Sequence, residues 1–407
     1  YQITPARTGE FTIPALALFY GGLVRKKNII STIYYSMSAA VVVSVLWVAF
    51  MYSLSFGPST DTGLGAWIGD FSRAFMNGVT TTSVHPNAGT IPESVYSMFQ
   101  LMFAIITVAL ISGAIVERMT FSAWFIFMIL WSVLVYTPLA HWVWNPSGWL
   151  FKAGALDFAG GLVVHTSSGV SALVLVKLLG PRTSFRKEPV SAPANIGYAF
   201  IGAALLWVGW FGFNAGSAVA ANGVAGSAFL VTNTAAAVAA LTWMILEWFA
   251  HGKPTLVGAS TGAVAGLVAI TPASGFVGVF GAFVLGAGVA IISFTFMSRL
   301  RNKFKYDDAL DVFSVHGLGG IWGALGTGLL ANGLVYNDVK GALYGNWGQF
   351  LIQFESVVAA VAISVIGTAV CYFITRLILR GKVRASDAGQ LSGLDLSEHG
   401  EILESAG

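Results

Sequence analysis

The chain has 407 residues, of which 56% are hydrophobic and only 10% are charged. A soluble globular domain is about 25% charged, so this chain cannot cover a soluble surface. That balance excludes a soluble enzyme, a nucleic-acid-binding protein and a disordered chain. The net charge of +3 is too small to indicate a polyanionic partner, and a single cysteine, Cys371, excludes a disulfide within the chain.

Apolar runs between polar breaks predict eleven membrane-spanning helices, since one span needs about 20 mostly apolar residues. The predicted spans are residues 11–24, 32–56, 94–116, 121–139, 158–179, 196–218, 227–249, 256–271, 276–297, 312–331 and 350–379. The expected organisation is a transmembrane domain at 1–379, with repeat halves at about 11–179 and 196–331 and a final helix at 350–379, followed by a cytoplasmic tail at 380–407.

The basic residues predict the orientation of these spans. Of the 21 Lys and Arg residues, 17 fall in one alternating set of loops and in the tail, and 4 fall in the other set. Cytoplasmic loops of membrane proteins are enriched in Lys and Arg. We therefore expect an all-α polytopic protein of the cell membrane, with its N-terminus outside and its C-terminus in the cytoplasm.

The fifth and tenth spans resemble each other in sequence. One contains Val164-His165 and the other Val315-His316, and an acid precedes each span, Asp157 and Asp311. Five spans separate the two positions, and an odd repeat length inverts the second copy. The pattern predicts an inverted five-plus-five repeat whose site lies near the midplane, where the two halves meet.

The two histidines, His165 and His316, are ionisable groups inside apolar spans, which by default indicates function. The plainer interpretation is a pair of structural histidines bonded to backbone or hydroxyl groups. Equivalent repeat positions favour instead a neutral imidazole pair that lines an apolar path or relays a proton. No acid stands in either span to complete a metal site, so we expect no metal and no cofactor.

Aromatic residues near the predicted outer surface form a second pattern. Most Trp, Tyr and Phe residues of such a chain belong to interfacial belts or helix packing. Trp144 in an outer loop, Phe103 in the third span, and Phe213 and Ser217 at the end of the sixth span are better placed. Together they predict an aromatic cup with one hydroxyl, which binds a small cation with roughly 0.5–2 kcal/mol per cation–π contact.

Five segments resemble the ammonium transporter/methylammonium permease/Rhesus family, and the ammonium transporter branch fits best. They are residues 19–28 (FYGGLVRKKN), 154–165 (GALDFAGGLVVH), 207–217 (WVGWFGFNAGS), 307–317 (DDALDVFSVHG) and 393–401 (GLDLSEHGE). The family's first span is a full apolar helix, and this chain departs from it with polar residues before Ile13.

The resemblance implies a homotrimer with one pore in each subunit. It implies that Trp144 and Ser217, with Phe103, recruit ammonium or methylammonium from outside, and that Phe103 and Phe213 form a stacked gate. It also suggests a PII-type cytoplasmic regulator, because the tail matches.

The resemblance further implies that His165 and His316 are the twin histidines of the pore. Asp157 matches an acid that the family needs for transport, as a brace at a helix end rather than a direct ligand.

Simple energetics support transport of ammonia rather than of the bare ion. Moving a cation into an apolar pore costs tens of kcal/mol by Born estimates. Removing a proton from an amine of pKa about 9–10 at pH 7 costs only roughly 3–4 kcal/mol. We therefore expect an ammonium transporter, not an enzyme, that deprotonates ammonium and moves the proton separately, with net electrogenic uptake.

Two other classes of function remain open at this stage. An ammonium sensor on the same fold would bind ammonium and transport little. An intramembrane enzyme is disfavoured because the chain lacks a suitable set of metal ligands and a nucleophile–base pair.

Overall fold

A computed structural model describes residues 11–185, 192–304, 306–336 and 338–403. These residues form helices and loops, and no β-strand is found among them. The α-helices are α2 (Thr12–Leu23), α3 (Ile29–Leu46), α4 (Tyr52–Phe56), α5 (Glu93–Ile115), α6 (Phe121–Trp131), α7 (Thr137–Trp144), α8 (Trp149–Ala153), α9 (Ser167–Leu179), α10 (Ile196–Gly216), α11 (Gly223–His251), α12 (Leu256–Ile270), α13 (Val279–Thr295), α14 (Arg301–Lys303), α15 (Leu318–Leu330), α16 (Trp347–Ile378), α17 (Asp387–Ser392) and α18 (Leu394–His399).

Short helical turns of other types join or precede these helices. The π-helical turns are η2 (Trp47–Met51), η5 (Ser132–Tyr136), η6 (Gly161–Thr166), η7 (Phe296–Leu300) and η8 (Phe313–Gly317). The 3₁₀ turns are η1 (Lys26–Asn28), η3 (Gly63–Ala66), η4 (Ala74–Met76) and η9 (Ala342–Tyr344).

A helix occupies each of the predicted spans. Within the described ranges, eight helical segments are long and apolar enough to cross a membrane, while α2 and α12 are shorter apolar helices. The fourth predicted span ended at Leu139, but its helix continues to Trp144. Two causes explain the difference: Pro138 stands in the first turn of α7, where its missing N–H is tolerated, and both ring nitrogens of the buried His141 contact backbone carbonyls.

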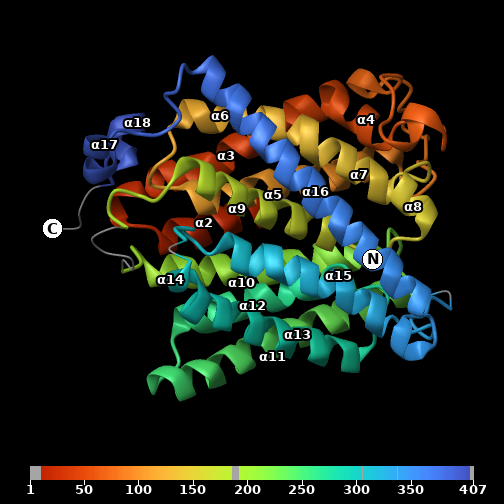
Figure 1. The fold of residues 1–407 in the computed structure, drawn as a ribbon. Helices are drawn as coiled ribbons and strands as arrows, with labels where there is room; N and C mark the ends of the chain where they lie inside the picture. Colours follow the sequence, from red (N-terminus) through yellow and green to blue (C-terminus); the bar gives the residue numbers. More distant parts are fainter. Residues whose placement is uncertain (1–10, 186–191, 305, 337, 404–407) are drawn as a thin grey trace.

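The helices lie side by side in one bundle with two end faces (Figure 1). Tail helices α17 and α18 lie at the end where α14 also lies, which we call the tail face. Helices α4 and α8 lie at the opposite end, which we call the Trp144 face. Helix α18 is held on the start of α3, because the Asp395 carboxylate accepts the backbone N–H groups of Ile30 (3.1 Å) and Ser31 (2.7 Å).

The packing of the helices is reciprocal between the two segments that were predicted as repeat halves. Helix α2 lies against α10, its counterpart in the other half. Turn η6 packs on α15, while η8 packs on α9. Glycines permit the close approach, because a Cβ on Gly169 would lie 2.1 Å from the backbone nitrogen of Gly317. This crossing brings His165 and His316, predicted as repeat equivalents, to the centre of the bundle.

Buried ion pairs tie the loops of the tail face together. Arg182 bonds the carboxylates of Asp307 (2.7 Å) and Glu117 (2.9 Å), and Arg118 lies 3.5 Å from Asp307. Burial alone would raise the pKa of the Asp307 carboxyl, but the Arg182 and Arg118 guanidinium groups outweigh burial and hold that pKa below its ordinary value of 3.8. Removing one partner would leave an unpaired buried charge.

Several sequence predictions concern residues 1–10, 186–191, 305 and 404–407. The polar start before Ile13, the basic residues Arg7, Arg186, Lys187 and Lys305, and the end of the tail lie wholly or partly outside the described residues.

Candidate functional site

The two predicted histidines contact each other in the middle of the bundle. The Nδ1 atoms of His165 and His316 are 3.2 Å apart, and their ring centroids are 5.2 Å apart. Both side chains are buried. One proton can occupy the short Nδ1–Nδ1 contact, so one ring donates there and the other accepts. No described protein group bonds Nε2 of His165, which leaves that atom available.

Each histidine lies in a π-helical turn, a feature that is often found at functional sites. Before the first turn, the Asp157 carboxylate accepts four backbone N–H groups at 2.6–3.1 Å, those of Gly160, Gly161, Leu162 and Val163. These are the N–H groups that a helix start leaves unpaired. The geometry of Asp157 is therefore that of a brace at a helix end.

The structure corrects the acid that was paired with Asp157 in the second repeat. Asp308, not Asp311, stands to His316 in the chain as Asp157 stands to His165. Asp308 accepts the N–H of Phe313 (2.8 Å) at the start of η8. Residue 311 corresponds to Gly160 instead, and both have positive φ, 56° for Asp311 and 107° for Gly160. The sequence pattern paired Asp157 with the acid nearest the apolar run, although the eight-residue spacing to the histidine, which Asp157 and Asp308 share, already distinguishes Asp308 from Asp311.

The predicted aromatic residues form a continuous series that leads to the histidines. The ring of Phe103 lies edge-on to Trp144 at 5.4 Å and lies 4.1 Å from the ring of Phe213. Phe213 in turn lies 6.5 Å from the ring of His165. Phe103 and Phe213 are buried, so together they separate the histidines from the Trp144 face.

A cavity of about 620 Å³ lies outside this pair of phenyl rings. Trp144, Phe103, Ser217 and Asp157 contribute to its lining, and we call it the Trp144 cavity. The indole N–H of Trp144 donates to the Asp157 carbonyl (2.8 Å), which fixes the ring plane. The Ser217 hydroxyl donates to the Phe213 carbonyl (2.8 Å), which leaves its lone pairs free to accept. The structure thus brings Trp144, Phe103 and Ser217 to one cavity, whereas Phe213, the fourth member of the predicted cup, is not among the residues that line it.

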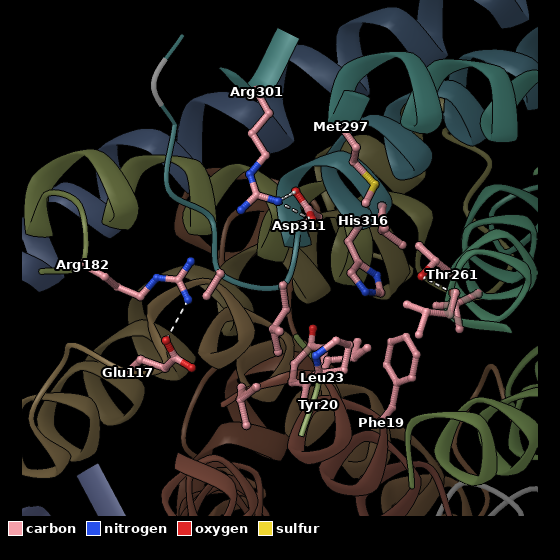
Figure 2. A pocket seen from close by; sticks show the side chains of 17 residues that line it. Phe19, Tyr20, Leu23, Glu117, Arg182, Thr261, Met297, Arg301, Asp311 and His316 are labelled. Atoms are coloured by element: carbon pink, nitrogen blue, oxygen red, sulfur yellow. Dashed lines mark hydrogen bonds and ion pairs between the residues drawn. The ribbon is translucent and has the colours of Figure 1, made fainter. Parts of the chain in front are cut away.

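A second cavity of about 260 Å³ lies on the other side of the histidines (Figure 2). We call it the Asp311 cavity. His316 faces it, and Arg301 with Asp311 lies along one part of its wall. Glu117 and Arg182 lie at another part. The rings that link the two cavities are those of Phe103, Phe213, His165 and His316.

Sequence reasoning missed Trp210 as a neighbour of the histidines. Its ring stacks on His165 with centroids 5.4 Å apart and planes 17° apart, and its N–H donates to the Thr271 hydroxyl (2.8 Å). One signal was available: Trp210 precedes Phe213 by one turn of α10, so both rings share a face of that helix. Among the described residues, no group of three or more His, Cys, Asp or Glu could hold a metal ion.

The chain is similar to known proteins over almost its whole length. A model of the Ammonium Transporter Family matches residues 6–403. An ammonium transporter of Bacillus subtilis is 46% identical over 391 residues, which cover 95% of this chain and 93% of the relative. Ammonium transporter Amt1 of Archaeoglobus fulgidus is 42% identical over 396 residues, covering 96% and 94%.

Solved structures show the same likeness. The crystal structure of Saccharomyces cerevisiae Mep2 matches with a TM-score of 0.86 and 34% identity, covering 94% of this chain and 86% of that one. A sensor Amt protein also matches, with a TM-score of 0.86 and 26% identity, covering 97% and 96%. On these matches the chain belongs to the ammonium transporter family, whose members are multi-pass membrane transporters rather than enzymes.

Proposed function

We propose that this protein recruits ammonium in the Trp144 cavity, deprotonates it, and conducts ammonia past Phe103 and Phe213 and along the two histidines to the Asp311 cavity. In this proposal the Trp144 face lies outside the cell and the tail face lies in the cytoplasm. The unequal distribution of Lys and Arg between the two sets of loops supports that orientation.

Recognition of the cation rests on the outer groups. The faces of Trp144 and Phe103 attract a small cation by roughly 0.5–2 kcal/mol each, and Ser217 supplies an acceptor for an N–H group. Hydroxyl lone pairs and ring faces select a cation with hydrogen-bond donors. Methylammonium, which keeps the charge and three N–H groups, is expected to bind in the same place.

The observation that carries the proposal is the uncharged series of rings between the two cavities. A cation there would lose its hydration, at a Born cost of tens of kcal/mol, and would gain only a few ring contacts. Ammonia needs only one or two hydrogen-bond partners. Nε2 of His165, which has no protein partner among the described residues, supplies one such position.

The proton is proposed to cross separately over the imidazoles. The Nδ1 atoms of His165 and His316 are within hydrogen-bond distance at 3.2 Å, so a proton can pass from one ring to the other. Each imidazole receives a proton on one nitrogen and gives one from the other. Transport is then net electrogenic.

Uptake of radiolabelled methylammonium into liposomes that contain the purified protein tests the proposal. We expect saturable uptake that ammonium competes away and that a Trp144→Leu, Ser217→Ala variant weakens through a higher KM. Liposomes without protein are the control. Uptake no faster than that control would refute the transporter assignment.

An ammonium sensor is the second candidate, favoured by the likeness to the sensor Amt protein. It predicts that ammonium binds to the purified protein and quenches tryptophan fluorescence while liposome uptake stays at the control rate.

The proposal also extends to assembly and regulation. We infer a homotrimer with one pore in each subunit, and a PII-type regulator that covers the tail face, where α17 and α18 lie. Native mass spectrometry of the detergent-solubilised protein tests the first point, since a monomer mass would contradict it. Co-purification with a PII-type protein tests the second, and transport that is unaffected by that protein would contradict it.

A further inference from the structure

One wall of the Trp144 cavity comes from α5 and the loop that precedes it. Asn87 in this loop lines the cavity together with Tyr96 and Gln100 of α5. The side-chain amide of Asn87 donates to the Trp144 carbonyl (2.8 Å), while the Trp144 indole donates to the Asp157 carbonyl (2.8 Å). Trp144 is thus held at two points, by its ring and by its backbone, and Asn87 provides the second point.

The neighbouring His85 holds Asn87 in place. Nε2 of His85 lies 2.9 Å from the Phe56 carbonyl, which can only accept, so this nitrogen carries a proton. Nδ1 of the neutral ring is then an acceptor, and it receives the backbone N–H of Asn87 (3.1 Å). The ring also stacks on Tyr96, with centroids 4.6 Å apart and planes 13° apart. His85 is not among the residues that line the cavity, so its effect there passes through its neighbours.

The surroundings of His85 favour the neutral ring. His85 is only 5% exposed, and burial lowers its pKa below the ordinary value of 6.5. The charged groups that face it are Glu93 and Arg73, which act on the ring in opposite directions and lie 3.8 Å from each other. The phenol of Tyr96 stays neutral in acid. Below its pKa the ring gains a proton on Nδ1, which can then no longer accept the Asn87 N–H.

We propose that His85 and Asn87 are positioning residues of the ammonium site, which hold the Trp144 backbone while His85 is neutral and release it when His85 is protonated. This inference rests on the proposed transport function. The apparent affinity of the Trp144 cavity for ammonium therefore falls in an acidic medium. Because coupling between two binding events is reciprocal, ammonium bound in the cavity in turn favours neutral His85.

Uptake of radiolabelled methylammonium into right-side-out membrane vesicles, with the interior buffered at pH 7.5, tests this proposal. Methylammonium stays charged from pH 7.5 to 4.5, since an alkylamine has a pKa of about 10. His85→Gln is the reference, because its amide can make both bonds of the neutral ring and gains no proton. Asp157 lines the same cavity in both proteins, so the readout is the ratio of wild-type KM to His85→Gln KM. We expect this ratio to rise about two- to tenfold as the medium falls from pH 6.5 to 4.5, the effect of one lost hydrogen bond.

A second variant tests whether His85 acts through Asn87. Asn87→Ala removes the bond to Trp144, so its KM should already be raised about two- to tenfold at pH 7.5. Its ratio to the KM of His85→Gln should then stay constant with pH.

Asn77→Ala is the matched control. Asn77 lies exposed in the same loop, and its amide also donates to a backbone carbonyl, that of Ser72 (3.1 Å). Its KM should follow the wild type at every pH. A wild-type ratio that does not change with pH, or an Asn87→Ala variant that responds to pH as the wild type does, would overturn the positioning roles alone. Wild-type vesicles without saturable uptake would overturn the proposed function and this inference with it.

Discussion

Replacing Asp157 by asparagine separates a structural role of this acid from a role as a substrate ligand. Its carboxylate accepts four backbone N–H groups at the start of η6. The amide of asparagine has one acceptor oxygen, which can satisfy about two of them. Two buried donors are then left without partners, at about 1–3 kcal/mol each, so the variant should lose about 2–6 kcal/mol. Asp157→Ala leaves all four donors unmet and should lose more.

The free energy of unfolding can be measured in detergent micelles by denaturant titration, with tryptophan fluorescence as the signal. The expected order of stability is wild type, then Asp157→Asn, then Asp157→Ala, with methylammonium uptake falling in the same order because η6 carries His165. Asp308→Ala should also destabilise, since Asp308 accepts the Phe313 N–H and the Tyr306 hydroxyl (2.9 Å), and alanine leaves both donors unmet. If Asp157→Asn kept wild-type stability but lost uptake, the structural role of Asp157 would be refuted. The carboxylate would then be a direct ligand of the substrate.

Two further predictions concern the two end faces. Arg182→Ala should cost about 3–5 kcal/mol in unfolding free energy, since it leaves two buried carboxylates short of their partner; an unchanged unfolding midpoint would contradict this. On the Trp144 face, burial lowers the pKa of His85 below its ordinary value of 6.5, and its Nδ1 accepts the Asn87 N–H (3.1 Å), which a protonated ring cannot do. The stability from neutral His85 is complete above pH 6.5 and is lost as pH falls toward the folded pKa, at up to about 1.4 kcal/mol per pH unit. The stability of wild type relative to His85→Gln should therefore decrease between pH 7.5 and 5.5, and a constant difference would contradict the buried neutral ring.

The spans could be predicted from the sequence because membrane helices are encoded in contiguous apolar runs. Hydropathy did not show the π-helical turns η6 and η8, which depend on how Gly160 and the neighbouring acids meet the backbone. It also ended the fourth span early, because the polar His141 is satisfied by the carbonyls of Ser55 and Gly65, which lie far from it in the sequence.

The candidate site was predictable where a resemblance marked individual residues, as at Trp144 and Phe213. Contacts between helices were not predictable in the same way. The stacking of Trp210 on His165 joins α10 to η6, and the pair of Arg301 with Asp311 joins two ends of one loop. The correct counterpart of Asp157 could have been found from its spacing to the histidine, since Asp157 and Asp308 each lie eight residues before one.

The most direct test of the account is the current evoked by an ammonium pulse on liposomes adsorbed to a solid-supported membrane, recorded together with internal pH. Wild-type protein should give a current and ammonia entry. A His165→Ala, His316→Ala variant should lose the current and keep ammonia entry, because the proton relay is gone while the apolar path remains. A full current in that variant would show that the charge crosses without the histidines, and would contradict separate transfer of ammonia and proton.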